Sequence, residues 1–177
     1  MPIYYLSENQ IPVPRIRRLD VRRWIRSVLQ SYGHTLGDLS YMFTDEPGIL
    51  AANLRYLGHD YYTDIITFEP AFAPEACPQE ENAPAAQTPI SGDILISLPT
   101  VAYNARRYNV PYSRELARVM VHGILHLCGL EDRSPQEEKA MRAAEEAALR
   151  LLDQDFPGPA NPFLRVTPPP VPEPPAD

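Results

Sequence analysis

The stretch VHGILHLCGLED, Val121 to Asp132, combines a helical pattern with a sharp stop. His122 and His126 are four residues apart, so on an α-helix they lie one turn apart on the same face. Gly129 follows, and a glycine at this place favours the left-handed conformation that ends a helix and turns the chain back. The acids just beyond the turn therefore come within reach of the two imidazoles.

Two imidazoles and one carboxylate favour a metal site, because a metal needs a third protein ligand that the same helix does not supply. Asp132 completes the spacing H-x3-H-x5-D. Zinc suits this donor set better than magnesium does. The pattern predicts one zinc ion held by His122, His126 and Asp132; the alternative is a pair of core histidines bonded to backbone groups.

The residue after the first histidine restricts the chemistry. Metalloproteases of the metzincin type share the histidine spacing and the glycine, but they place a glutamate there as general base. This chain has Gly123 instead, so the pattern does not predict a peptidase. A glycine inside a helix costs about 1 kcal/mol relative to alanine. Gly123 therefore indicates close approach of another backbone or a substrate, or tight packing of the helix against a strand.

Arg118 lies four residues before His122, on the same face of the predicted helix. A guanidinium there can give two parallel hydrogen bonds to a phosphate near the metal. It can equally pair with Glu115 at the helix surface. Both interpretations stay open at this stage.

Composition favours one folded domain without a membrane span. The chain has 177 residues and 44% hydrophobic residues, and no run approaches the eighteen or more apolar residues of a span. The N-terminus lacks the pattern of a secretory signal, and Cys77 and Cys128 are too few for a disulfide framework. We expect a location in the reducing cytoplasm.

The net charge of −7 argues weakly against a nucleic-acid partner, although Arg15 to Arg26 holds six arginines against Asp20 alone.

Hydrophobic periodicity and turn residues predict four strands and about five helices. The strands are expected at Ile3–Leu6, Leu39–Thr44, Thr63–Phe68 and Gly92–Ser97. The helices are expected at Val21–Tyr32, Gly48–Leu57, Ser97–Tyr108, the motif helix with Ser113 as N-cap, and a final helix from the capping box SPQE at Ser134–Glu137 to Leu152.

Two segments are expected to stay outside the packed fold. Residues 70–90 are rich in proline and alanine without periodicity, which predicts a long mobile loop. Residues 157–177 are proline-rich and predict a disordered tail. The folded domain is then expected over residues 1–156.

The motif HGILHLCGLED resembles the H-G-x-L-H-L-x-G signature of the YbeY family, metal-dependent endoribonucleases of small-subunit ribosomal RNA maturation. The segment NLRYLGHDYYTDIITF is similar to the family's segment around T-D-V-L-S-F, and GDILIS resembles its G-D-I strand. The order and spacing of these motifs cover the chain from about residue 1 to residue 152. The resemblance implies an α/β (α+β) domain in which helices pack on a small mixed sheet, with the metal helix central.

The same resemblance implies that His122 and His126 hold zinc, and it exposes two departures. The commonest family pattern has a third histidine where this chain has Asp132, which adds a negative charge at the metal. Many members carry an arginine at the position that aligns with Leu57. Arg55 or Arg118 would then have to take the part of that arginine.

The implied function is a zinc-dependent endoribonuclease, specific for single strands, that acts in 3′-end maturation of 16S ribosomal RNA and in ribosome quality control. Its partners would be single-stranded ribosomal RNA and the small ribosomal subunit. His122 would be catalytic by holding the ion that polarises the scissile phosphodiester, with Arg118 or Arg55 stabilising the charge of the transition state. The alternative is a ribosome-associated assembly factor with a structural metal and little catalysis.

Overall fold

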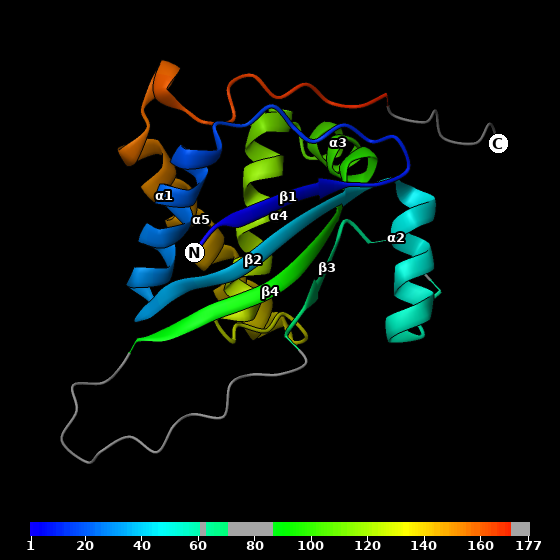
Figure 1. Ribbon diagram of the computed structural model, residues 1–177, viewed down its shortest axis with the longest axis horizontal. Coiled ribbons are helices and arrows are strands. Elements are labelled where there is room, and N and C mark those ends of the chain that lie inside the picture. The colour runs from blue at the N-terminus through cyan, green and yellow to red at the C-terminus, as the bar shows by residue number, and fades with distance from the viewer. Residues whose placement is uncertain (61–62, 71–86, 171–177) are drawn as a thin grey trace, which may run out of the picture.

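A four-stranded mixed sheet organises the chain, and the computed structural model describes residues 1–60, 63–70 and 87–170 (Figure 1). The strand order is β1-β2-β4-β3, with β1 parallel to β2, β2 parallel to β4, and β3 antiparallel to β4. The strands are β1 (Ile3–Ser7), β2 (His34–Thr44), β3 (Ile65–Phe68) and β4 (Thr88–Ser97). The predicted mixed four-stranded sheet is confirmed.

Within the described ranges five α-helices accompany the sheet, as the periodicity predicts. They are α1 (Arg18–Ser31), α2 (Glu46–Ala52), α3 (Leu98–Arg107), α4 (Tyr112–Leu127) and α5 (Pro135–Asp155). Two short helical turns complete the elements, a π-helical turn η1 (Asn53–Leu57) directly after α2 and a 3-10 turn η2 (Gly158–Ala160).

The alternation of side chains along the strands divides the core between two faces of the sheet. Ile94 and Ile96 of β4 belong to the main core with α1, α3, α4 and α5, whereas Leu95 between them packs with Ile49 of α2 on the opposite face. Helix α2 is therefore separated by the sheet from the other four helices.

Helix α4 is central because most of its surface is buried. Residues on several faces of this helix are less than 2% exposed. They are Leu116, Ala117, Val119, Met120, Val121, Ile124 and Leu125. The Tyr41 hydroxyl of β2 donates to the Met120 carbonyl at 3.0 Å, which ties the helix to the sheet.

Gly123 allows this helix to lie close to the sheet. A Cβ atom there would come within 2.9 Å of two Ile94 carbons and 3.1 Å of Ile65 Cδ1. These distances are shorter than ordinary carbon contacts, so a side chain would push the helix and the sheet apart. The packing explanation for Gly123 is the one that the structure supports.

Several predicted boundaries were wrong. Helix α4 begins at Tyr112 with Pro111 as N-cap and no side-chain cap, so Ser113 lies inside the first turn. Helix α3 ends at Arg107, one residue before the predicted end, and Tyr108 is 58% exposed. The end of the predicted 70–90 loop belongs to the sheet, because β2 begins earlier than expected and pairs His34 to Leu36 with Thr88 to Ile90. Residues 71–86 of that loop lie outside the described residues.

The predicted tail also starts too early. Phe163 is 1% exposed and packs edge-on against the buried Trp24 ring at a centroid distance of 5.8 Å. Asn161 Oδ1 accepts a hydrogen bond from the Phe163 amide at 2.8 Å. The Arg17 amide also donates to the Pro162 carbonyl at 3.1 Å, and Ala160 and Val166 pack against the core, so the segment is held although its composition is poor in apolar residues. Residues 171–177 lie outside the described part of the chain.

Candidate metal centre

The two motif histidines lie on one face of α4 near its C-terminal end. Their rings are 4.5 Å apart between centroids and nearly perpendicular, at 86°. The Nε2 atoms of His122 and His126 face each other at 2.9 Å. The four-residue spacing thus produces the convergence that the sequence predicts.

The turn after α4 brings the third side chain back to the histidines. Gly129 has a φ of +92°, its amide donates to the His126 carbonyl at 2.8 Å, and the Leu130 amide donates to the Leu125 carbonyl at 3.1 Å. The chain thereby reverses within a few residues. Asp132 Oδ2 lies 3.5 Å from His122 Nε2 and 3.6 Å from His126 Nε2.

The second nitrogen of each histidine is already occupied. His122 Nδ1 donates to the Glu145 carboxylate of α5 at 2.6 Å, and His126 Nδ1 donates to the Leu130 carbonyl at 2.8 Å. Both acceptors require a proton on Nδ1, so in a neutral imidazole the lone pair lies on Nε2. In the neutral imidazoles these two lone pairs lie beside the Asp132 carboxylate, so the three groups form a donor set that a cation can bind.

The spacing of the three donors fits a tetrahedral metal ion. Ligands about 2.0 to 2.1 Å from a tetrahedral zinc are about 3.3 Å apart. The three observed separations of 2.9, 3.5 and 3.6 Å bracket that value. His122, His126 and Asp132 form the group of side chains that could hold a metal ion among the residues that the structure describes.

Arg118 is enclosed by carboxylates. Its guanidinium donates to both Glu115 oxygens at 2.9 and 2.6 Å and to Glu145 at 3.1 Å, and Asp64 lies 3.7 Å away. Glu115 is only 3% exposed, so the predicted pairing lies inside the protein and not on the helix surface. The Arg118 guanidinium therefore already pairs with carboxylates, whereas one of its two predicted roles was to bind a phosphate near the metal.

Burial and charge act in opposite directions on the two other acids of this cluster. Burial raises the pKa of the Asp64 carboxyl, and the Arg118 charge offsets only part of that effect. Burial also acts to raise the pKa of Glu145, but the His122 hydrogen bond and the Arg118 charge outweigh it and hold the pKa below its usual value. Glu145 is therefore ionised at neutral pH.

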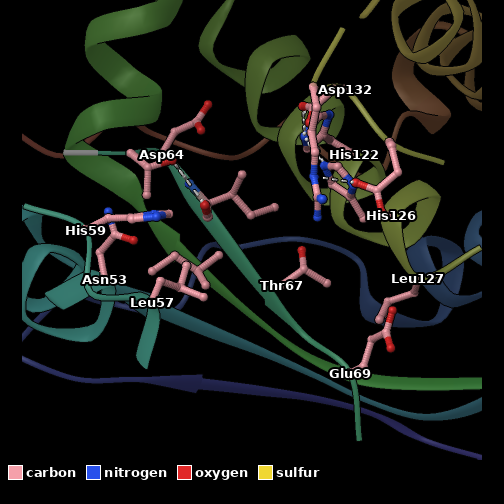
Figure 2. A pocket seen from close by; sticks show the side chains of 15 residues that line it. Asn53, Leu57, His59, Asp64, Thr67, Glu69, His122, His126, Leu127 and Asp132 are labelled. Atoms are coloured by element: carbon pink, nitrogen blue, oxygen red, sulfur yellow. Dashed lines mark hydrogen bonds and ion pairs between the residues drawn. The ribbon is translucent and has the colours of Figure 1, made fainter. Parts of the chain in front are cut away.

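A cleft of about 520 Å³ opens beside the metal group (Figure 2). In the figure His122, His126 and Asp132 point toward one another on one side, across from Asn53, Leu57, His59 and Asp64. Arg133, next to Asp132, is the one arginine among the described residues that line this cleft.

A second cleft of about 490 Å³ lies on the α5 side of the same group. His122 and Asp132 line both clefts. The donor group therefore borders both clefts. Arg118 lines the second cleft together with Arg142 and the exposed Tyr108.

The other two predicted positions, Arg55 and Leu57, lie on η1. Arg55 is exposed, with its guanidinium 5.4 Å from the centre of the Tyr56 ring, and it is absent from the lining of both clefts. Leu57 is 49% exposed and lines the first cleft, so the position where the resemblance places an arginine does face the site. Glu131 lies 3.3 Å from Arg133, whereas Asp132 takes the place at the histidines.

Sequence reasoning missed Glu145 and Arg133. Glu145 lies four residues after Met141 and four before Leu149, so the spacing of α5 places it on the buried face, but its partner His122 belongs to another helix. Arg133 directly follows Asp132, and its adjacency to a predicted ligand was the available signal.

The fold and the donor group together define an α/β protein with a candidate metal site, formed by an acid and two histidines that line two clefts. The family model for Endoribonuclease YbeY matches residues 7–153, and the chain belongs to this family. The Endoribonuclease YbeY of Porphyromonas gingivalis is 48% identical over 144 residues, covering 81% of this chain and 86% of that protein. The one of Phocaeicola vulgatus is 43% identical over 150 residues, covering 85% and 98%.

A solved structure agrees with the fold. The solution structure of a Thermotoga maritima protein superposes with a TM-score of 0.53 at 20% identity and covers 87% of this chain and 91% of its own. Membership of the family makes the chain an endoribonuclease that acts on RNA and implies a part in ribosomal RNA processing. Among the described residues no helix is both long and apolar enough to cross a membrane.

Proposed function

We propose that this endoribonuclease depends on one zinc ion held by His122, His126 and Asp132 and that it cuts single-stranded RNA. The observation that carries the proposal is the convergence of His122 Nε2, His126 Nε2 and the Asp132 carboxylate, with the Nδ1 atoms of both histidines bonded elsewhere. Two imidazoles and one carboxylate are a ligand set typical of catalytic zinc. The Asp132 carboxylate also neutralises one of the two positive charges, which a third histidine would leave uncompensated.

The side chains around the cleft suggest how the substrate is held. Zinc bound at this group would supply Lewis-acid polarisation of a phosphoryl oxygen and a more acidic water. Arg133 places a positive charge at the mouth of the cleft, beside Asp132, where it can contact an RNA phosphate. We therefore assign the phosphate contact to Arg133 and not to Arg55 or Arg118.

The two clefts support internal cleavage of a flexible strand. Because His122 and Asp132 line both openings, RNA can enter from one side and leave on the other without presenting an end. A single strand can bend over the group between them, whereas an A-form duplex has a rigid shape and a deep, narrow groove.

The biological role that we propose is 3′-end maturation of 16S ribosomal RNA and ribosome quality control in the cytoplasm, with the small ribosomal subunit as partner. Membership of the family supports ribosomal RNA as the substrate class. The local cluster of arginines on α1 offers a basic surface on an otherwise acidic chain.

A second candidate is a ribosome-associated assembly factor with a structural metal and little catalysis. Two observations favour it: Leu57 supplies no cation to the cleft, and Arg118 is enclosed by Glu115, Glu145 and Asp64. In that case the metal would stabilise the turn after α4, and RNA would bind without being cut.

The test compares wild type with H126A and D132A, with D38A as a control for removing an exposed acid. Bound zinc is measured by atomic emission, and cleavage is measured on a fluorescent single-stranded RNA and on its duplex. We expect both ligand variants to lose zinc and single-strand cleavage, with D38A unchanged. If wild type binds zinc and both variants still cut RNA normally, the nuclease assignment is refuted. Zinc binding without cleavage by wild type would favour the assembly factor.

A further inference from the structure

Glu145 lies directly behind His122, on the side away from Asp132. Its side chain is 7% exposed, and it comes from α5, whereas both histidines come from α4. It accepts hydrogen bonds from His122 Nδ1 at 2.6 Å and from Arg118 at 3.1 Å. A buried carboxylate is costly unless it is paired, and here both of its partners carry donors aimed at it.

Arg118 keeps this carboxylate in place. The Arg118 guanidinium is itself fixed by two hydrogen bonds to the buried Glu115, three residues earlier on α4. It therefore reaches across to α5 from a defined position. The cluster Glu115–Arg118–Glu145 links the two helices and ends on a ligand of the proposed metal.

The two histidines consequently differ in their support. His126 Nδ1 donates to the neutral Leu130 carbonyl, whereas His122 Nδ1 donates to an ionised carboxylate. A carboxylate partner fixes the Nδ1-protonated tautomer and makes the opposite nitrogen a stronger donor to a metal. His122 should be the stronger ligand of the pair for this reason.

We propose that Glu145 is a positioning residue for the metal centre: it holds His122 in the tautomer that presents Nε2, and through Arg118 it makes metal affinity depend on the docking of α5. The metal half of this inference rests on the proposed function. The tautomer half concerns the metal-free protein and stands independently of it.

The experiment uses three variants of the full chain. Glu145→Met removes the acceptor at similar volume, and Glu145→Gln keeps an acceptor oxygen but removes the charge. Glu146→Gln is the matched control, because its side chain is the next on α5 and is 73% exposed. Three quantities are measured: the His122 tautomer in the metal-free protein by ¹⁵N NMR, zinc affinity by competition with a chelating dye, and the metal-free melting temperature.

We expect wild type and E146Q to show His122 protonated on Nδ1. E145M should show a mixture of tautomers and a zinc affinity lower by about 10- to 100-fold, the usual effect of losing such a partner. E145Q should keep the tautomer but bind zinc at least about threefold more weakly, because the carboxylate charge is gone.

The proposal is overturned if E145M keeps both the wild-type tautomer and the wild-type zinc affinity while only its melting temperature falls, since Glu145 would then serve the fold alone. If E145M does not fold, E145Q decides, and an unchanged zinc affinity there refutes the role of the carboxylate charge. Wild type that binds no zinc would refute the proposed zinc enzyme, while the tautomer measurement would still decide the role of Glu145.

Discussion

The two walls of the first cleft are built differently. On the motif wall, His122, His126 and Asp132 are each held by a helix, a tight turn or a hydrogen-bonded partner. The facing wall includes Asn53 and Leu57 of the π-helical turn η1, which is capped by Gly58 with a φ of +67°. Its residues Leu54, Tyr56 and Leu57 are between 46% and 61% exposed.

The two walls therefore suit different tasks. The motif wall suits binding an ion, and the facing wall suits recognising a substrate. A metal requires donor atoms fixed to within a few tenths of an ångström, and the motif wall fixes them through buried hydrogen bonds. RNA recognition requires exposed cations and adaptable surfaces, which irregular segments supply. Changes on the motif wall should therefore abolish activity, while changes on η1 should only modulate it.

The largest expected effect is the loss of zinc stabilisation in D132N. Zinc present at about 1,000 times its Kd should add about 4 kcal/mol to the free energy of unfolding of wild type. For a chain of this size that corresponds to a rise in melting temperature of about 8 to 16 °C. D132N keeps the shape of Asp132 but offers a neutral, weaker ligand, so most of the rise should disappear.

The measurement is thermal unfolding across a zinc titration, with D38N as control for a neutralised exposed acid. D38N should follow wild type. If zinc raises the melting temperature of D132N as much as that of wild type, Asp132 is not a ligand and zinc is held through other atoms.

A smaller effect is expected from the arginine beside the motif wall. R133A removes the arginine that lines the first cleft. One exposed charge-assisted contact contributes roughly 1 kcal/mol, so the KM for single-stranded RNA should rise about fivefold. The slope of log affinity against log salt should become shallower by about 0.7. The measurement is cleavage kinetics at several salt concentrations.

R55A is the matched comparison on η1, outside the cleft lining. Arg55 is absent from the cleft lining and stands over Tyr56, so its removal should leave KM within about twofold of wild type. A larger effect of R55A than of R133A would reverse the assignment of the phosphate contact.

The same contrast explains which parts the sequence could predict. The spacing of His122 and His126, the Gly129 turn and the acid after it are local, and helix geometry converts such a pattern directly into a constellation. The capping box at Ser134 is local too, and the structure contains both of its hydrogen bonds. For the same reason, the apolar periodicity of four strands and five helices gave the right elements.

Interactions between distant segments could not be predicted. Glu145 is 23 residues from His122. The apolar spacing of α5 places it on the buried face, unlike the exposed Glu146, but it does not show which residue of another helix the carboxylate meets. The choice for Arg118 between phosphate and carboxylate depended on whether α5 and β3 would bring acids to it. Phe163 likewise lay in a proline-rich segment, and its anchoring depends on a slot beside Trp24 that only the assembled fold creates.

The smallest effect, an increase, is expected from L57R on the facing wall. Leu57 lines the cleft at the position where the resemblance places an arginine in many relatives, and it is exposed enough to accept a longer side chain without strain. A cation there faces the cleft in which we propose that RNA binds, but it remains in contact with solvent. It should therefore contribute at most about 1 kcal/mol to RNA binding. KM for single-stranded RNA should fall by about two- to fivefold.

L54R is the control that separates position from added charge. Leu54 lies three residues earlier on the same turn and is 46% exposed, but it does not line the cleft. Both variants raise the net charge equally, and both should leave the free energy of unfolding within about 0.5 kcal/mol of wild type. A fall in KM for L57R alone would show that η1 contacts the substrate. An equal fall for both would mean that RNA senses only the overall charge of this wall, in which case substrate recognition belongs to the motif wall together with Arg133.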